Sequence, residues 1–138
     1  MREIKTTSVA ETEAFAEDFA KTLKAKDVLA FFGEMGAGKT AFVRGLAKGL
    51  GITENISSPT FAIVNDYGAL AHFDMYRIET WEDLYSTGFF DCIDQGKILA
   101  VEWSENIENA LPENAIRITI TKGEGENDRT ITIEGETE

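Results

Sequence analysis

A glycine-rich segment between two apolar stretches constrains this chain more than any other feature. Residues 33–40 have the sequence GEMGAGKT, which fits the spacing G-x-x-x-x-G-K-[ST]. The apolar run over residues 28–32 predicts a buried strand before it, and residues 41–50 predict a helix after it. A strand, a glycine loop and a helix in this order predict a phosphate-binding loop, because loop amides and a helix N-terminus attract anions. An ordinary strand-to-helix turn is the alternative, but it does not need the full motif.

Each fixed position of the motif has a chemical role in such a loop. Glycines allow backbone angles closed to other residues and let phosphate oxygens approach the main chain. Lys39 is expected to reach the β and γ phosphates, and the Thr40 hydroxyl is expected to bind Mg²⁺. The predicted nucleotide-binding residues form one run: Gly33, Glu34, Met35, Gly36, Ala37, Gly38, Lys39 and Thr40.

The charge balance limits the classes of partner. The 138 residues include 25 Asp and Glu against 13 Lys and Arg, a formal net charge of −12. Such a chain has no basic footprint for nucleic acid, so we expect no direct DNA binding and expect partner proteins to hold any RNA. The length predicts a single domain over residues 1–138. The phosphate site is expected to be locally positive, because Lys39 and the loop amides act over short distances.

The sequence predicts a cytoplasmic protein with no membrane contact. Its longest apolar run is only a few residues, and its first residues lack the apolar core of a signal peptide. Cys92 is the single cysteine and has no internal disulfide partner, which fits a reducing compartment. We interpret it as a small, partly buried thiol.

A second candidate site residue ends an apolar run. Residues 98–101 are apolar and are followed by Glu102, as in a buried strand that delivers a carboxylate beside a phosphate-binding loop. Glu102 is therefore a candidate to bind or orient the metal, and a strand-terminating acid is the alternative. Trp103 comes next, either as a core residue or as a neighbour of the nucleotide.

Two further candidates lie between these segments. Thr60 follows a Ser-Ser-Pro sequence where a switch loop is expected, so it is a candidate to sense the γ-phosphate and Mg²⁺. A turn stiffened by proline is the alternative. Asp74 lies in a strand-like run and is a candidate for the metal or the attacking water, unless it pairs with Arg77 or caps a turn. His72 shares a strand face with Asp74, and we interpret it as a structural group.

Periodicity and turn signals predict the remaining elements. Ser8 and Glu11 have the spacing of a capping box, which predicts a helix from Ser8 to residue 25. The runs 61–67 and 70–76 meet near Gly68 and predict a hairpin. The other expectations are a strand at 3–7, a helix at 80–86 capped by Thr80, a loop at 88–91, a helix at 105–111, and a closing hairpin of strands 115–121 and 129–134.

Four motifs in one order resemble a known family. GExGAGKT, SPTF, HFDxYR and VEW occur in that order between residues 33 and 103. Together they resemble the TsaE (YjeE) family, the ATPase component of bacterial tRNA threonylcarbamoyladenosine synthesis. The resemblance covers about residues 8 to 105. Many families share the first motif, and the three later motifs make the match specific; Met35 departs from it, where leucine is common.

The resemblance implies a fold and a function. The implied fold is α/β, a three-layer P-loop NTPase fold with a mixed β-sheet. The implied role is at adenosine 37 of tRNAs that read codons starting with A, where the chain would not transfer the threonylcarbamoyl group itself. It would bind the TsaD–TsaB pair and hydrolyse ATP, with Mg²⁺, to support repeated turnover, and would meet tRNA only through these partners.

The resemblance also implies residue roles. Thr40 and Glu102 serve Mg²⁺, and Thr60 and Asp74 lie close to the γ-phosphate or the attacking water. Thr12 approaches the base or ribose of the nucleotide, and Trp103 matches the family's tryptophan. Hydrolysis by the isolated chain is expected to be slow, because the sequence shows no clear arginine finger. Arg44 and Arg77 are the only arginines near a motif.

The sequence leaves three other functions open. A small-molecule kinase would need a basic lid over the phosphates, and no such segment occurs in the sequence. A GTPase would need an Asn-Lys-x-Asp segment to recognise guanine, and none is present. A nucleotide-gated binding module, in which ATP only controls assembly, is compatible with the same motifs.

Overall fold

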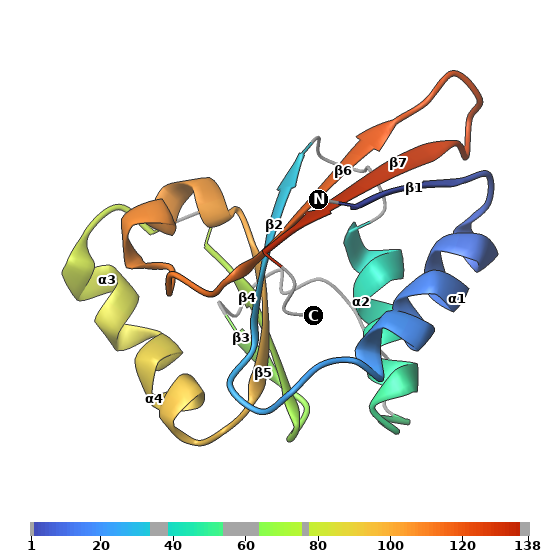
Figure 1. Ribbon diagram of the computed structural model, residues 1–138. Helices are drawn as coiled ribbons and strands as arrows, with labels where there is room; N and C mark the ends of the chain where they lie inside the picture. The colour runs from blue at the N-terminus through green and yellow to red at the C-terminus, as the bar shows by residue number, and fades with distance from the viewer. Residues whose placement is uncertain (1, 34–38, 54–63, 76–77, 136–138) are drawn as a thin grey trace.

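The computed structural model describes residues 2–33, 39–53, 64–75 and 78–135. Within these ranges the chain forms seven strands, four α-helices and one 3-10 helix, η1 (Figure 1). The strands are β1 Arg2–Thr6, β2 Val28–Gly33, β3 Val64–Asp66, β4 Leu70–Asp74, β5 Ile98–Glu102, β6 Ile116–Lys122 and β7 Arg129–Glu134. The helices are α1 Val9–Ala20, α2 Lys39–Gly49, α3 Trp81–Ser86, α4 Phe89–Asp94 and η1 Ser104–Ala110.

All seven strands belong to one mixed sheet, in the order β1-β7-β6-β2-β5-β4-β3. The four central strands β6, β2, β5 and β4 run parallel to one another. The flanking strands β7 and β3 run antiparallel to their central neighbours, and β1 runs antiparallel to β7. The carboxyl ends of the four central strands therefore lie along one edge of the sheet.

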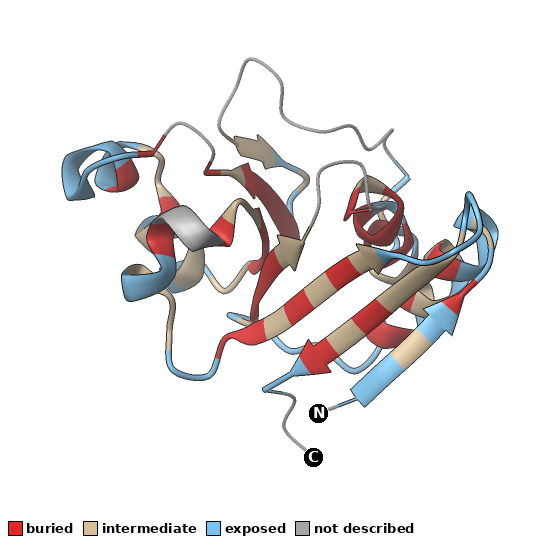
Figure 2. Ribbon diagram, turned by 90° about the horizontal axis from the view of Figure 1, so that it is seen from above, coloured by how far each residue is buried: buried red, intermediate tan, exposed pale blue. Residues whose placement is uncertain are grey.

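Helices cover both faces of the sheet and make three layers (Figure 1). One apolar core joins α1 and α2 to the sheet and contains Phe19, Phe31 and Phe42. The other joins α3, α4 and η1 to the opposite face and contains Phe73 and Phe89. Buried residues alternate along β6 and β7, whereas residues 28–31 of β2 are all buried (Figure 2). The predicted three-layer α/β fold with a mixed sheet is confirmed.

Helix α1 begins where it was predicted but ends earlier. The Ser8 hydroxyl accepts a hydrogen bond from the Glu11 amide at 3.1 Å, which is the expected N-cap. The helix ends at Ala20 instead of residue 25. Tight turns replace it there, because the Thr22 amide and hydroxyl both donate to the Phe19 carbonyl and the Lys24 amide donates to Asp27. These turns redirect the chain into β2.

The expected loop at residues 88–91 is wrong, because α4 begins at Phe89. Gly88 has φ +81 and the Thr87 hydroxyl accepts a hydrogen bond from the Phe89 amide at 3.1 Å, so the chain turns directly into the helix. The turn buries Phe89 against Phe73, with ring centroids 5.7 Å apart. The predicted hairpins and the Thr80 cap of α3 are confirmed. In the part of the chain that the structure describes, no helix is long and apolar enough to cross a membrane.

Candidate functional site

The candidate site lies along the edge where the parallel strands end. β2 ends at Gly33, β4 ends at Asp74 and β5 ends at Glu102. Asp74 and Glu102 are register partners on adjacent parallel strands, so both carboxylates leave the sheet at the same level. The first described residue after Gly33 is Lys39, which begins α2. The edge thus combines two acidic side chains with the flanks of the glycine-rich segment.

Gly33 has a packing reason to be glycine. It has φ +116, a conformation that L side chains rarely adopt, and it pairs with Ile120 of β6. A Cβ at this position would lie well inside the contact distance of the Ile120 carbonyl oxygen. The close approach of two backbones requires a glycine here, independently of any bound phosphate.

A buried histidine holds the carboxylate of Glu102. His72 Nε2 lies 2.8 Å from Glu102 Oε2, where its N–H donates to the carboxylate. The His72 side chain is fully buried, whereas the Glu102 side chain is 12% exposed. The Met75 amide donates to the Glu102 carbonyl oxygen at 3.0 Å. Glu102 is therefore fixed at both backbone and side chain, with its carboxylate at the surface of the site.

Lys39 lies against Trp103. The Lys39 ammonium is 5.6 Å from the centroid of the indole ring, within the range of a cation–π contact. Lys39 is 7% exposed, and Trp103 is half-buried. Trp103 has φ +58, so the chain turns sharply between β5 and η1 and brings the ring back towards α2. The structure brings together Gly33, Lys39, Asp74, Glu102 and Trp103 along this edge.

Thr12 lies in a different environment from the edge residues. Its side chain is buried, and its hydroxyl lies 2.7 Å from that of Thr6 and 3.3 Å from the Ser8 carbonyl oxygen. These contacts join the start of α1 to β1. Thr40 follows Lys39 in the first turn of α2 and is half-buried.

Several predicted site residues lie outside the described ranges. They are Glu34, Met35, Gly36, Ala37 and Gly38 of the glycine-rich segment, Thr60, and Arg77. Among the described residues, no group of three or more His, Cys, Asp or Glu side chains could hold a metal ion by itself. The Glu102 carboxylate and the Thr40 hydroxyl nevertheless offer the oxygen ligands that suit Mg²⁺, which is commonly held by one or two carboxylates together with substrate phosphates.

The sequence did not reveal the role of His72. Its position two residues before Asp74 placed both on one strand face, but the contact with Glu102 depends on the pairing of β4 with β5. Cys92 lies in α4, away from the strand ends, and burial raises the pKa of its thiol. It is a half-buried thiol, as predicted.

Comparisons with known proteins point to one family. The family model described as "Threonylcarbamoyl adenosine biosynthesis protein TsaE" matches residues 6–131. The Bacillus subtilis protein named "tRNA threonylcarbamoyladenosine biosynthesis protein TsaE" is 42% identical over 140 residues, covering 96% of this chain and 86% of that protein. The Treponema pallidum protein of the same name is 35% identical over 116 residues. This match covers 82% of this chain and 86% of that protein.

A solved structure shows the same fold. The crystal structure of Bacillus subtilis YdiB superposes with a TM-score of 0.76 at 35% identity, covering 96% of this chain and 83% of that one. The matched sequence includes both strands that carry the acidic residues and both flanks of the glycine-rich segment. This chain belongs to the TsaE family.

Proposed function

We propose that this chain is an ATPase that acts in tRNA threonylcarbamoyladenosine biosynthesis together with a TsaD–TsaB pair. The observation that carries the proposal is the register of Asp74 and Glu102 at the ends of adjacent parallel strands, of which β5 pairs with β2. Membership of the TsaE family supports the pathway, because the relatives carry its name. The GEMGAGKT sequence supports the assignment of a nucleotide as the ligand.

The same residues account for the proposed ligands, ATP and Mg²⁺. Residues 33–40 would hold the phosphates, with Lys39 neutralising the β and γ groups. Thr40 and Glu102 would hold Mg²⁺, whose chemistry is to neutralise phosphate charge. The contact of Glu102 with His72 uses one carboxylate oxygen and orients the other. Trp103 already contacts the Lys39 ammonium, so the indole is a candidate wall of the nucleotide site.

Hydrolysis at this site would depend on positioning and charge. Water attacks the γ-phosphorus in line, one P–O bond forms as the bond to ADP breaks, and phosphate leaves. Asp74 is proposed to orient the water, and Thr60 to sense the γ-phosphate. The group of described edge residues contains no arginine, and Arg44, the described arginine nearest the glycine-rich segment in sequence, is on the exposed face of α2. Partner proteins are therefore proposed to complete the site and to carry the tRNA.

The lysine substitution tests the assignment directly. Lys39→Ala should abolish ATP hydrolysis and tRNA modification, because it removes the proposed phosphate-binding ammonium. Lys48→Ala is the matched control, since Lys48 is an exposed lysine of the same helix whose ammonium lies 3.5 Å from the Glu13 carboxylate. Full activity in the Lys39→Ala variant would rule out the phosphate-binding role.

A metal titration tests the role of Glu102. Glu102→Ala should reduce ATP hydrolysis, and higher Mg²⁺ should restore part of it, because a missing ligand weakens metal binding rather than removing the phosphate site. Unchanged hydrolysis at low Mg²⁺ would remove Glu102 from the site. A variant that binds ATP without hydrolysing it and still sustains repeated modification cycles would instead support the nucleotide-gated binding module.

A further inference from the structure

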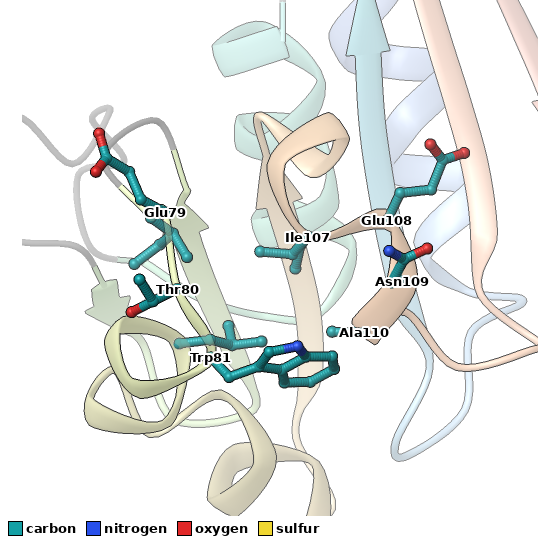
Figure 3. Close-up of a pocket in the computed structure, with 9 residues that line it drawn as sticks. Glu79, Thr80, Trp81, Ile107, Glu108, Asn109 and Ala110 are labelled. Atoms are coloured by element: carbon teal, nitrogen blue, oxygen red, sulfur yellow. The ribbon is translucent and has the colours of Figure 1, made fainter.

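A groove separates α3 from η1 on the face of the sheet opposite α1 and α2 (Figure 3). Its volume is about 330 Å³. Ile78, Leu84 and Ile107 contribute buried apolar side chains to its lining. Glu79 and Glu108 are exposed and lie at opposite walls (Figure 3). Buried apolar side chains thus lie beneath the groove, while most of its accessible lining is polar and carries two acidic side chains at its walls.

Two aromatic side chains extend the apolar surface along α3. Trp81 is 54% exposed and Tyr85 is 65% exposed, and their ring centroids are 6.3 Å apart. The ring centroid of Tyr85 lies 5.2 Å from that of Phe90 in α4. Among the described residues, Val9 is the only other large hydrophobic side chain that is exposed. Clustered exposed aromatic rings beside a groove with a polar rim are typical of a protein–protein contact surface.

The charge around this surface selects the kind of partner. Residues 78–96 contain no Lys, Arg or His and include the acids Glu79, Glu82, Asp83, Asp91 and Asp94. Residues 104–116 also contain acids and no basic residue, and the first basic residue after them, Arg117, pairs with Glu108 at 3.0 Å. A polyanion such as tRNA, or a second acidic copy of this face, would be repelled.

We propose that the groove between α3 and η1 docks a basic segment of a partner protein, which inserts an apolar side chain beside Trp81 and pairs Lys or Arg with the acidic rim. The assignment of this segment to the TsaD–TsaB pair rests on the proposed function. The walls of the groove support that assignment, because each continues from a strand that ends at a site carboxylate. Residues 78–80 follow β4 and Asp74, and η1 follows β5 and Glu102 with only Trp103 between them.

The location of the groove also links a docked partner to the candidate site. A partner seated in the groove contacts the two segments that leave Asp74 and Glu102, so it lies next to the edge where arginines are lacking among the described residues.

The test measures the affinity of the full chain for a purified TsaD–TsaB pair by calorimetry in the presence of ATP. The groove variants are Trp81→Ala and Glu79→Lys. Their matched controls are Val9→Ala on α1 and Glu124→Lys in the β6–β7 loop, which make the same kinds of change at exposed positions away from the groove. Basal ATP hydrolysis and circular dichroism of each variant report whether its fold and site are intact.

The proposal predicts that each groove variant raises the Kd by about tenfold or more, while the controls change it by about twofold or less. Basal ATP hydrolysis should be the same in all four variants, and the affinity of the unmodified chain should fall as salt rises. Equal affinity of groove and control variants would overturn the groove assignment and leave the proposed function standing. No binding by the unmodified chain would overturn both the proposed partner and the groove assignment.

Discussion

The carboxylate of Glu102 is oriented by a histidine that lies inside the sheet. His72 is fully buried on β4, and its Nε2 is 2.8 Å from Glu102 Oε2 on β5. A fixed carboxylate loses little conformational freedom when it binds a ligand, so a hydrogen-bonded neighbour strengthens a metal site. At the residue scale, the site therefore depends on a second side chain behind the proposed ligand.

His72→Ala should weaken the proposed Mg²⁺ site. The half-saturating Mg²⁺ concentration for ATP hydrolysis should rise, because Glu102 loses the group that orients it. The free energy of unfolding should fall by about 1–3 kcal/mol, as expected when a buried hydrogen bond loses one partner. His72→Gln keeps an N–H donor, so its half-saturating Mg²⁺ concentration should lie between those of the unmodified chain and His72→Ala. An unchanged Mg²⁺ dependence in His72→Ala would contradict the positioning role.

The candidate site residues could be predicted only in part. The position of Glu102 at a strand end followed from four apolar residues and an acid, and Asp74 followed from a strand-like run. The contact between Glu102 and His72 could not be predicted, because it depends on which strands are neighbours and in which register. The contact between Lys39 and Trp103 likewise requires the left-handed turn at Trp103.

At the scale of elements, α1 and α2 pack closely through two glycines. A Cβ on Gly45 would meet the Glu13 carbonyl oxygen and the Ala16 Cβ, and a Cβ on Gly49 would meet the same atom types of Glu17 and Ala20. The backbones of the helices therefore approach each other without intervening side chains. Such packing holds α2, and with it Lys39, against the sheet.

Gly45→Ala should destabilise the protein although alanine favours helices. The helix propensity gain is about 1 kcal/mol, but overpacking between the helices costs about 1–3 kcal/mol. We expect a net loss of up to about 2 kcal/mol in the free energy of unfolding, measured by urea denaturation. Lys48→Ala, on an exposed position of the same helix, should change it by about 0.5 kcal/mol or less. A more stable Gly45→Ala variant would contradict the close packing.

The turn between β3 and β4 should make the free energy of unfolding slightly dependent on pH. The Gly68 amide, at 2.9 Å, lowers the pKa of Asp66, and the Lys97 ammonium, at 3.1 Å, adds to this effect. A lowered pKa in the folded state stabilises the protein above the unfolded value of about 3.8, and this stability is lost as the pH falls through the folded pKa. The Asp66 side chain is 53% exposed, so the effect is modest.

Asp66→Asn isolates this contribution. The difference in free energy of unfolding between the unmodified chain and the variant should be present at pH 7 and should shrink as the pH falls below about 4. Thermal denaturation across that pH range measures it. A difference that stays constant from pH 7 to pH 2 would show that the lowered pKa of Asp66 does not contribute to folding.

Local patterns predicted element types better than element ends. The Ser8 and Thr80 caps, the two hairpins and the buried strands β2 and β5 follow from turn residues and periodicity. Helix α4 could not be predicted from residues 88–91, because its start depends on the packing of Phe89 against Phe73. The local sequence does not show that contact. The early end of α1 depends on the tight turns that lead to β2.

At the scale of the whole molecule, the chain separates a proposed phosphate site from an acidic exterior. The formal net charge is −12, and the face formed by α3, α4 and η1 carries acids without compensating lysines. The strand order β1-β7-β6-β2-β5-β4-β3 places β5, which ends at Glu102, next to β2, and β4, which ends at Asp74, next to β5. This order could not be predicted from local patterns, since it depends on how distant strands pair.

The net charge predicts that the chain alone does not bind tRNA. In a gel-shift assay at physiological salt, we expect no saturable binding up to about 10 μM, because few lysines and arginines are available to displace counterions. The same assay with the TsaD–TsaB pair added is the positive control for the tRNA. Saturable binding by the isolated chain would contradict the proposal that partners hold the RNA.

The most direct test of the account is steady-state ATP hydrolysis by this chain, alone and with a titrated TsaD–TsaB pair. A slow basal rate that rises with the pair and saturates is predicted, because the pair is proposed to complete the site beside Asp74 and Glu102. Lys39→Ala should show neither the basal nor the stimulated rate. A folded, nucleotide-bound chain whose hydrolysis does not change when the pair is added would contradict the account.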